Sequence, residues 1–285
     1  MSATETFSGT VATALRRMRP SLSKSELKVA AALLSNYPIS GMASIATIAQ
    51  SAGVSEPTVS RLVTKLGFDG FASFRKALAQ EVSQRLLPPT LIEPKAMGSA
   101  SLSQIAAAMA EEMLKSMLAI DGADLGDAVE LLCDPSRRVF IVGGRVTSTL
   151  AKHLAWSLEV LRPGVTYVGE ATGERVNELL NVEHGDVVVA FDFRRYQADT
   201  IAFVKKASLQ GAESILFTDP FMSSAAGDAR VVFHASIGGP SQFTSLVPTL
   251  AIVETLVSMV ASGLGEQAHS RMERYVENSE LFTER

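Results

Sequence analysis

Polar side chains of residues 55–65 stand at spacings suited to contact with a nucleic acid. Glu56 and Thr58 lie at the start of a predicted helix, and such residues reach base edges when a helix enters the major groove of DNA. Arg61 could bind a guanine or a phosphate, and Lys65 a phosphate. We therefore predict a DNA contact surface made of Ser44, Ser55, Glu56, Thr58, Ser60, Arg61 and Lys65.

Two helices joined by a tight turn would position these side chains. Gly53 follows an apolar helical pattern over residues 45–52, at a point where a left-handed backbone excludes most side chains. Ser44 is expected to cap the first helix and Ser55 the second, whose first turn holds Pro57. This is the helix-turn-helix pattern, although a helical hairpin with a merely polar surface would share it. The residues expected to face inward are Ile48, Ala49, Ala52, Val54, Val59 and Leu62, and those expected on the outer face of the second helix are Ser55, Glu56, Thr58, Ser60, Arg61, Thr64 and Lys65.

A second polar set follows two apolar runs in the other half of the chain. Residues 143–148 place glycines, an arginine and hydroxyls directly after one run, so the backbone could approach a ligand closely. Residues 192–197 follow the other run and hold paired arginines, which can bind a carboxylate or phosphate bidentately. Alternatively, Asp192 pairs with one arginine as a structural bridge. The predicted ligand-binding residues are Gly143, Gly144, Arg145, Thr147, Ser148, Asp192, Arg194, Arg195 and Tyr196.

Alternating strands and helices would bring these two loops together. β-rich runs separated by helical patterns favour a parallel sheet covered by helices, in which ligands bind beyond the carboxyl ends of the strands. Trp156 lies inside one amphipathic helix and is expected in the core. The expected fold class is an all-α helix-turn-helix N-terminal domain plus an α/β C-terminal domain. The predicted strands of the second domain are residues 139–142, 165–168, 186–191, 214–218 and 230–233, and its predicted helices are residues 102–118, 125–132, 147–161, 197–210 and 246–262.

Charge is distributed unevenly along the chain, whose formal net charge is −4. Residues 1–90 carry ten Lys and Arg against five Asp and Glu, whereas residues 91–285 carry sixteen against twenty-five. A basic DNA-binding module joined to an acidic sensor would produce this asymmetry, and so would a solvated basic helix face. Three prolines within residues 86–94 predict an extended connector. We predict a DNA-binding domain at 1–87, a linker at 88–98 and a sensing and oligomerisation domain at 99–285.

Composition and motifs exclude several classes of protein. With 47% apolar and 20% charged residues, the chain has the composition of a globular protein. Its single cysteine, Cys133, cannot form an intramolecular disulfide, and its four histidines lack the spacing of metal ligands. No stretch approaches the roughly 18 uncharged apolar residues of a membrane span, and the first residues lack a signal-peptide pattern. We expect a cytoplasmic protein without a metal, a cofactor or a membrane partner.

The chain resembles the RpiR family of bacterial regulators, which join an N-terminal helix-turn-helix domain to a C-terminal sugar isomerase (SIS) domain. The resemblance covers nearly the whole chain, and residues 48–61, Ile-Ala-Gln-Ser-Ala-Gly-Val-Ser-Glu-Pro-Thr-Val-Ser-Arg, carry its most specific part. It implies dimers or tetramers that bind inverted-repeat DNA operators, with phosphosugars or related intermediates as effectors. SIS domains usually carry two serine-rich loops. Here only Thr147 and Ser148 keep the hydroxyl character of the first loop, and residues 192–196 replace the second with charge, so a sugar acid is also a candidate effector.

Two other functions remain open at this stage. A phosphosugar isomerase or lyase would need a general base, for which Glu170, Glu174 and His184 are available without a pattern that joins them. An architectural DNA-binding protein would use its C-terminal domain only to dimerise. The favoured interpretation is a regulator of carbohydrate or related catabolic genes, without catalytic residues. Its expected partners are a double-stranded DNA operator, a small anionic metabolite and further copies of itself in a homodimer or homotetramer.

Overall fold

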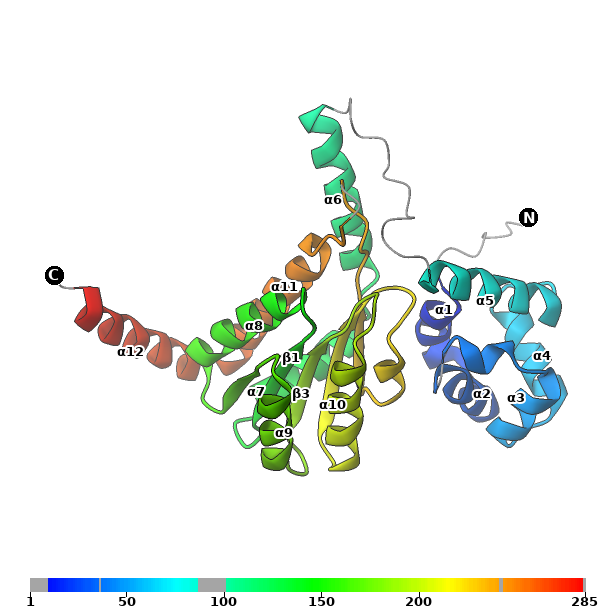
Figure 1. Cartoon of the computed structure of the whole chain (residues 1–285), viewed down its shortest axis with the longest axis horizontal. Coiled ribbons are helices and arrows are strands. Elements are labelled where there is room, and N and C mark those ends of the chain that lie inside the picture. The colour runs from blue at the N-terminus through cyan, green and yellow to red at the C-terminus, as the bar shows by residue number, and fades with distance from the viewer. Residues whose placement is uncertain (1–9, 36, 87–100, 241–242, 284–285) are drawn as a thin grey trace. The chain divides into compact units, whose positions relative to one another are not determined.

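Two compact units make up the computed structural model of the chain, which describes residues 10–35, 37–86, 101–240 and 243–283 (Figure 1). The first unit comprises Met1–Glu93 and Asp219–Gly227, and the second comprises Pro94–Thr218 and Asp228–Arg285. The predicted linker at 88–98 lies outside the described residues.

Helices build the N-terminal part of the first unit (Figure 1). Ser23 and Glu26 form a capping box at the start of its second helix, because the Ser23 hydroxyl accepts from the Glu26 amide while the Glu26 carboxylate accepts from the Ser23 amide. Leu33, Val59 and Leu62 are almost fully buried where three of the helices meet. The described helices are α1 (Val11–Met18), α2 (Lys24–Leu34), α3 (Ile45–Ala52), α4 (Glu56–Lys65) and α5 (Phe71–Leu86), with short 3-10 turns at Arg19–Ser21 and Ile39–Met42.

A parallel sheet forms the centre of the second unit, as the alternation of strands and helices predicts. Its strands lie in the order β2-β1-β3-β4-β5, and all four neighbouring pairs are parallel. The order reverses between β1 and β3, so the chain leaves these two strands in opposite directions, and in sheets of this kind ligands bind beyond the carboxyl ends of such a strand pair. The strands are β1 (Val139–Gly143), β2 (Val165–Val168), β3 (Val187–Phe191), β4 (Glu213–Thr218) and β5 (Val231–His234). The chain between the last two strands contains a short 3-10 turn at Ser224–Gly227, which belongs to the first unit.

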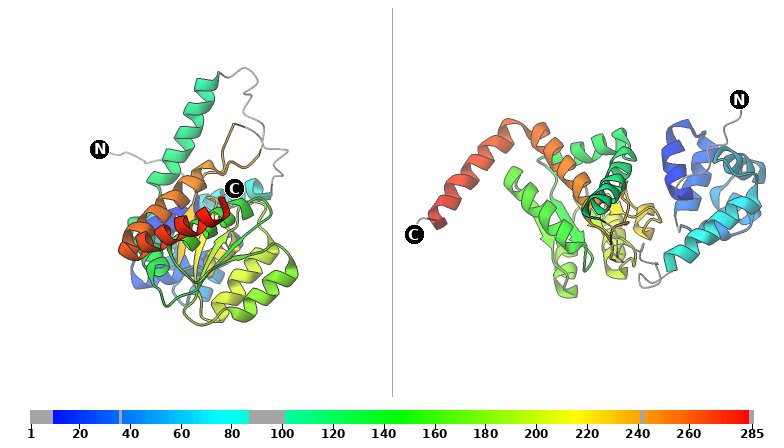
Figure 2. Two further views of the ribbon diagram at one scale, coloured as in Figure 1. Left: turned by 90° about the vertical axis from the view of Figure 1, so that its left-hand side faces the viewer. Right: turned by 90° about the horizontal axis from the view of Figure 1, so that it is seen from above.

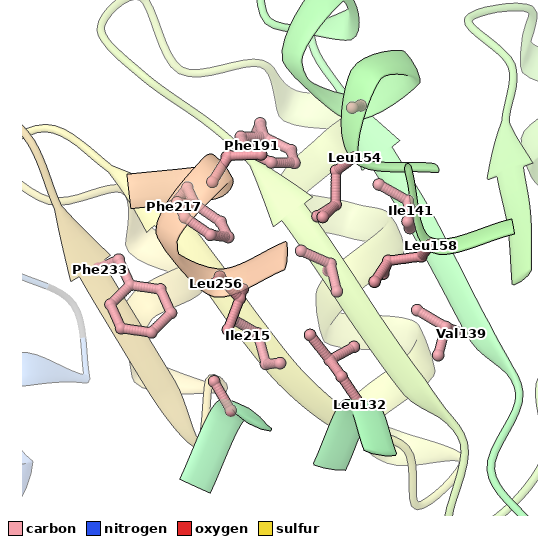
Figure 3. Packing of buried hydrophobic residues seen from close by; sticks show 14 of the residues in the cluster. Leu132, Val139, Ile141, Leu154, Leu158, Phe191, Ile215, Phe217, Phe233 and Leu256 are labelled. Atoms are coloured by element: carbon pink, nitrogen blue, oxygen red, sulfur yellow. The ribbon is translucent and has the colours of Figure 1, made fainter. Parts of the chain in front are cut away.

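Helices cover both faces of this sheet (Figures 1 and 2). Apolar residues of α7, α8 and α11 share one cluster with alternate residues of the strands, whereas α9 and α10 pack against β2, β3 and β4. Figure 3 shows Phe191, Phe217 and Phe233 in a row across that cluster, with centroids 4.6 Å and 5.1 Å apart for successive rings. The helices of the second unit are α6 (Leu102–Leu118), α7 (Gly122–Cys133), α8 (Ser148–Leu161), α9 (Thr172–Asn181), α10 (Ala198–Leu209), α11 (Val247–Leu264) and α12 (Glu266–Thr283).

Several expectations about the second unit need correction. Trp156 is 55% exposed and so does not belong to the core, because it lies on the side of α8 that points away from the sheet. Helices α9 and α12 are present in addition to the predicted ones. Among the described helices, α11 is long and apolar enough to cross a membrane by length and composition, contrary to the expectation that no stretch approaches this size. Its residues Ile252, Val253 and Leu256 are fully buried in the core cluster.

Candidate nucleic-acid interface and ligand site

The turn between α3 and α4 has the predicted geometry. The Ser44 hydroxyl caps α3 by accepting a hydrogen bond from the Thr47 amide at 3.1 Å. Gly53 ends the helix with φ 61° and ψ 42°, a left-handed conformation that favours glycine. An added Cβ would meet nothing within 4 Å, so the backbone angle and not a lack of space selects glycine here. The helix-turn-helix pattern is therefore formed as the sequence indicates.

Helix α4 presents part of the predicted DNA contact surface to solvent. Glu56, Ser60 and Arg61 are exposed, while Val59 and Leu62 are buried against the other helices. The Arg61 guanidinium lies along its own helix, where Nε donates to the Pro57 carbonyl at 3.3 Å. Contacts this long and exposed exchange readily with solvent or a phosphate, so the side chain is available for another acceptor.

Thr58 and Ser55 differ from their predicted placement. Thr58 is only 7% exposed, because it lies four residues before the buried Leu62 and therefore shares the inner face of α4. Ser55 occupies the N-cap position, but its hydroxyl makes no capping hydrogen bond and instead lies 3.1 Å from the Thr58 hydroxyl. The placement of Thr58 on the outer face and the capping role of Ser55 were therefore wrong.

Lys65 is held within the first unit. Its Nζ donates to the Ser21 carbonyl at 2.7 Å and lies 3.3 Å from a Glu26 carboxylate oxygen. The Ser23 amide, assisted by Lys65, keeps the pKa of Glu26 below its ordinary value. A phosphate contact by Lys65 would thus have to compete with an existing ion pair.

Neighbouring atoms approach the two glycines at the end of β1 closely. A Cβ on Gly143 would lie 2.8 Å from the Ser148 amide nitrogen, and one on Gly144 would lie 2.1 Å from the Gln197 side-chain oxygen. Both loops at the carboxyl edge of the sheet therefore meet at Gly144. A larger residue at Gly143 would require the backbone of residues 147 and 148 to shift, whereas one at Gly144 would require the Gln197 side chain to move.

Hydroxyl groups of the first loop are engaged in hydrogen bonds within the protein. The Thr147 hydroxyl accepts from the Gly144 amide and donates to the Phe191 carbonyl at the end of β3, both at 2.8 Å. The Ser148 hydroxyl donates to the Arg145 carbonyl at 3.1 Å. These two residues therefore shape the loop.

Gln197, which the sequence did not single out, joins the two predicted loops. Its side-chain oxygen accepts a hydrogen bond from the Arg145 backbone amide at 2.6 Å, and its backbone amide donates to the Asp192 carboxylate at 2.9 Å. Asp192 is 1% exposed. The other charged and aromatic side chains of the two loops are more accessible than Asp192. Arg145 and Arg195 are exposed, and Arg194 and Tyr196 are half-buried. The structure thus brings the predicted ligand-binding residues to one edge of the sheet.

Arg175 of α9 is a further residue that sequence reasoning missed. It is 5% exposed, and its guanidinium donates to the Gly143 carbonyl at 2.7 Å and the Gly169 carbonyl at 3.3 Å. It also donates to the Thr200 hydroxyl and pairs with Asp199, each at 3.1 Å. One side chain therefore ties the ends of β1 and β2 to the first turn of α10. No motif marks it, since α9 was not predicted.

The candidate catalytic groups lie at different ends of the sheet. Glu170 follows β2 and lies 3.7 Å from Lys152, in an open groove of about 380 Å³ that Glu174 also lines. His184 precedes β3 and contacts the region of Gly211, where an added Cβ would lie 2.6 Å from its ring. These three residues therefore do not form one site. Within the described ranges, no three His, Cys, Asp or Glu side chains are grouped so that they could hold a metal ion.

Comparisons with known proteins agree with this architecture. The model of the helix-turn-helix domain of the rpiR family matches residues 9–85, and that of the SIS domain matches residues 133–259. An uncharacterized HTH-type transcriptional regulator of Haemophilus influenzae is 27% identical over 229 residues, which cover 76% of each chain.

Solved structures share the fold. The sugar isomerase domain of an RpiR transcription factor from Sphaerobacter thermophilus aligns with a TM-score of 0.58 and 22% identity over 61% of this chain and 97% of that one. The Vibrio vulnificus NanR protein, complexed with ManNAc-6P, aligns with a TM-score of 0.54 and 19% identity over 96% and 99% of the two chains. With its helix-turn-helix unit and SIS-like parallel sheet, the chain belongs to the RpiR family of transcriptional regulators.

Proposed function

We propose that this protein regulates carbohydrate or related catabolic genes in the cytoplasm, and that a small anionic metabolite controls its affinity for DNA. The effector, a phosphosugar or a sugar acid, binds at the carboxyl ends of β1 and β3. The single observation that carries this proposal is that Gln197 joins the two loops, because it bonds to the Arg145 amide of one loop and to the buried Asp192 of the other, while Arg145 and Arg195 stay exposed.

The loop chemistry favours an anionic group on the ligand. Thr147 and Ser148 already have internal partners, so they are less free to bind a phosphate than hydroxyls that face solvent. The guanidinium groups of Arg194 and Arg195 present planar donors that suit carboxylate and phosphate alike. The ManNAc-6P bound to the NanR protein supports a phosphosugar. The charge on residues 192–196 keeps a sugar acid as an alternative.

DNA binding is assigned to α4 and the residues around it. Glu56, Ser60 and Arg61 would enter the major groove, and Ser44 at the start of α3 would contact the backbone. Because a two-fold pair of such helices reads two related half-sites, a homodimer or homotetramer would bind an inverted repeat. Ligand and DNA are coupled if the effector binds one arrangement of the paired DNA-binding units more tightly than another.

The protein acts by binding and not by catalysis in this proposal. Glu170 and Glu174 lie beyond the end of β2, whereas His184 lies before the start of β3, so these three candidate bases would not act together on one substrate. Incubation with glucose 6-phosphate or fructose 6-phosphate should leave both compounds unchanged by NMR. Conversion of either one above the rate of a blank would contradict a purely regulatory role.

A thermal-shift screen of the full chain tests the effector assignment. The panel contains N-acetylmannosamine 6-phosphate, glucose 6-phosphate, 6-phosphogluconate, gluconate, sorbitol and inorganic phosphate. A ligand present at 100 times its dissociation constant should add about 2.7 kcal/mol of stability. Stabilisation by gluconate but not glucose 6-phosphate would identify a carboxylate site, and the reverse would identify a phosphate site.

Substitutions in the second loop, residues 192–197, test whether the anionic group of the effector binds there. Arg195→Ala should abolish the stabilisation, because Arg195 is exposed at the predicted site and holds no described structural contact. Lys205→Ala removes an exposed cation of α10 and serves as the matched control. Equal stabilisation of wild type and Arg195→Ala would refute this placement. No stabilisation by any compound would favour the architectural function.

A further inference from the structure

Helix α12 extends away from the rest of the second unit (Figures 1 and 2). Its first part is anchored, since Ala268 is 3% exposed and Arg271 Nε donates to the Glu159 carbonyl of α8 at 2.8 Å. Every side chain of residues 272–282 is exposed. The second half of α12 therefore lacks any covering surface in the described part of its own chain.

One side of this uncovered segment is apolar. Met272, Tyr275, Val276 and Phe282 are 45%, 46%, 54% and 88% exposed, and their spacing places them on one face of the helix with Ser279 between them. A helical segment of about 12 residues is marginal in water without tertiary packing. We call residues 272–282 the arm, and we expect its apolar face to be covered by another protein surface.

A matching surface lies on α8. Trp156 is 55% exposed and stands three residues before Glu159, so it occupies the turn next to the α8 to α12 anchor. Lys152, one turn earlier on the same side, is a further exposed residue. The arm carries Arg274 as well as Glu273, Glu277 and Glu280, and Lys152 is already paired with Glu170, so the match between the two surfaces rests on their apolar residues. Large aromatic residues of this kind often anchor protein interfaces.

We propose that residues 272–282 pack on the α8 surface around Trp156 of a second copy of this chain, and that the second copy does the same in return. This proposal rests on the homo-oligomer in the proposed function and names the surface through which two copies associate. A stable interface has about 20–30 residues a side, and the 11 residues of the arm with the seven residues of α8 that are not buried supply 18, close to that range. Reciprocal packing covers both patches on both chains and closes on itself, whereas an unrelated partner seated on the arm would leave Trp156 exposed.

Sedimentation equilibrium of the full chain tests this arrangement. Wild type should be a dimer or tetramer, and Trp156→Glu or Tyr275→Glu should each raise the dissociation constant at least 100-fold, because each places a charge in an apolar contact. Leu180→Glu is the matched control, since Leu180 is 79% exposed on α9, outside the proposed surface, and should leave the dissociation constant unchanged. Far-UV circular dichroism spectra that match wild type would confirm that the variants fold, whereas their melting temperatures should fall with the loss of association.

Disulfide trapping tests the reciprocal contact directly. In a Cys133→Ser background, Trp156→Cys and Tyr275→Cys chains each hold a single thiol, so a bond between these two positions can form only between chains. Mixing the two should give a linked dimer on oxidation, whereas mixing Leu180→Cys with Tyr275→Cys should not. A monomeric wild type, unaltered association of the glutamate variants, or equal linking in both mixtures would overturn the proposal. Effector binding and DNA binding are measured separately, so each can survive that result.

Discussion

Polar side chains are held in opposite ways on α4 of the first unit and in the ligand loops of the second. Glu56, Ser60 and Arg61 are exposed on one helix and owe their placement to a turn between neighbours in sequence. Thr147 and Gln197, in contrast, are bonded to groups from a different strand or loop. A surface that meets a long polyanion can be presented by a single helix, whereas a site for a small molecule needs several chain segments held in register.

Arg175→Ala is the variant for which this contrast predicts the largest loss of stability. Loss of the buried guanidinium leaves the Gly143 and Gly169 carbonyls and the Thr200 hydroxyl without a donor, which should cost the second unit about 2–4 kcal/mol of unfolding free energy. Urea unfolding followed by circular dichroism measures it. Arg195→Ala, an exposed control, should change stability by less than about 0.5 kcal/mol. Equal losses of unfolding free energy in the two variants would contradict the contrast.

Gly53→Ala tests the local character of the helix-turn-helix unit. The substituted residue must keep φ near 61°, which should cost about 1–2 kcal/mol although space for the methyl group is free. Gly70→Ala is the control, since Gly70 lacks a positive φ and also has open space around an added Cβ. The same unfolding measurement applies. A loss for Gly70→Ala as large as that for Gly53→Ala would argue against a backbone origin.

Thr147→Val should have a smaller effect, confined to the second unit. Removing the hydroxyl leaves the Gly144 amide and the Phe191 carbonyl with only their direct contact of 3.3 Å, at a cost of about 1 kcal/mol. Thr149→Val changes an exposed neighbour in the same way and should be nearly neutral. If both variants unfold like wild type, the Thr147 hydroxyl does not hold the two loops together.

The smallest expected effect is on how stability depends on pH, and it involves the buried Glu81 of α5. Its carboxylate accepts from the Val11 amide at 2.9 Å and from the Tyr37 hydroxyl, while burial raises the pKa of Glu81 above its ordinary value. A carboxyl group whose pKa is raised by folding stabilises the protein below its unfolded pKa and loses that contribution as pH rises through the folded one. Glu81→Gln should therefore reduce the fall in stability above pH 4.5. Parallel pH profiles of variant and wild type, from urea unfolding, would contradict this.

The sequence carried more information about the first unit than about the second unit's site. Gly53, the α3 and α4 bounds and the inner residues follow from neighbours in the chain. Thr58 differs from its predicted outer position because it lies one turn before the buried Leu62. The order of the strands and the roles of Gln197 and Arg175 depend on contacts between distant segments. No single sequence pattern encodes such contacts. Trp156 was misplaced for a similar reason, since an amphipathic pattern does not say which residue borders the exposed side.

The most direct test of the account measures DNA binding by fluorescence anisotropy, with DNA fragments selected by the full-length protein from its source genome. Arg61→Ala should weaken binding about 5- to 150-fold, since a good bidentate contact to a base contributes about 1–3 kcal/mol. Lys28→Ala removes an exposed cation elsewhere in the first unit and should stay within about twofold of wild type. Wild-type affinity in a correctly folded Arg61→Ala protein would contradict the assignment of α4 as the DNA-binding helix.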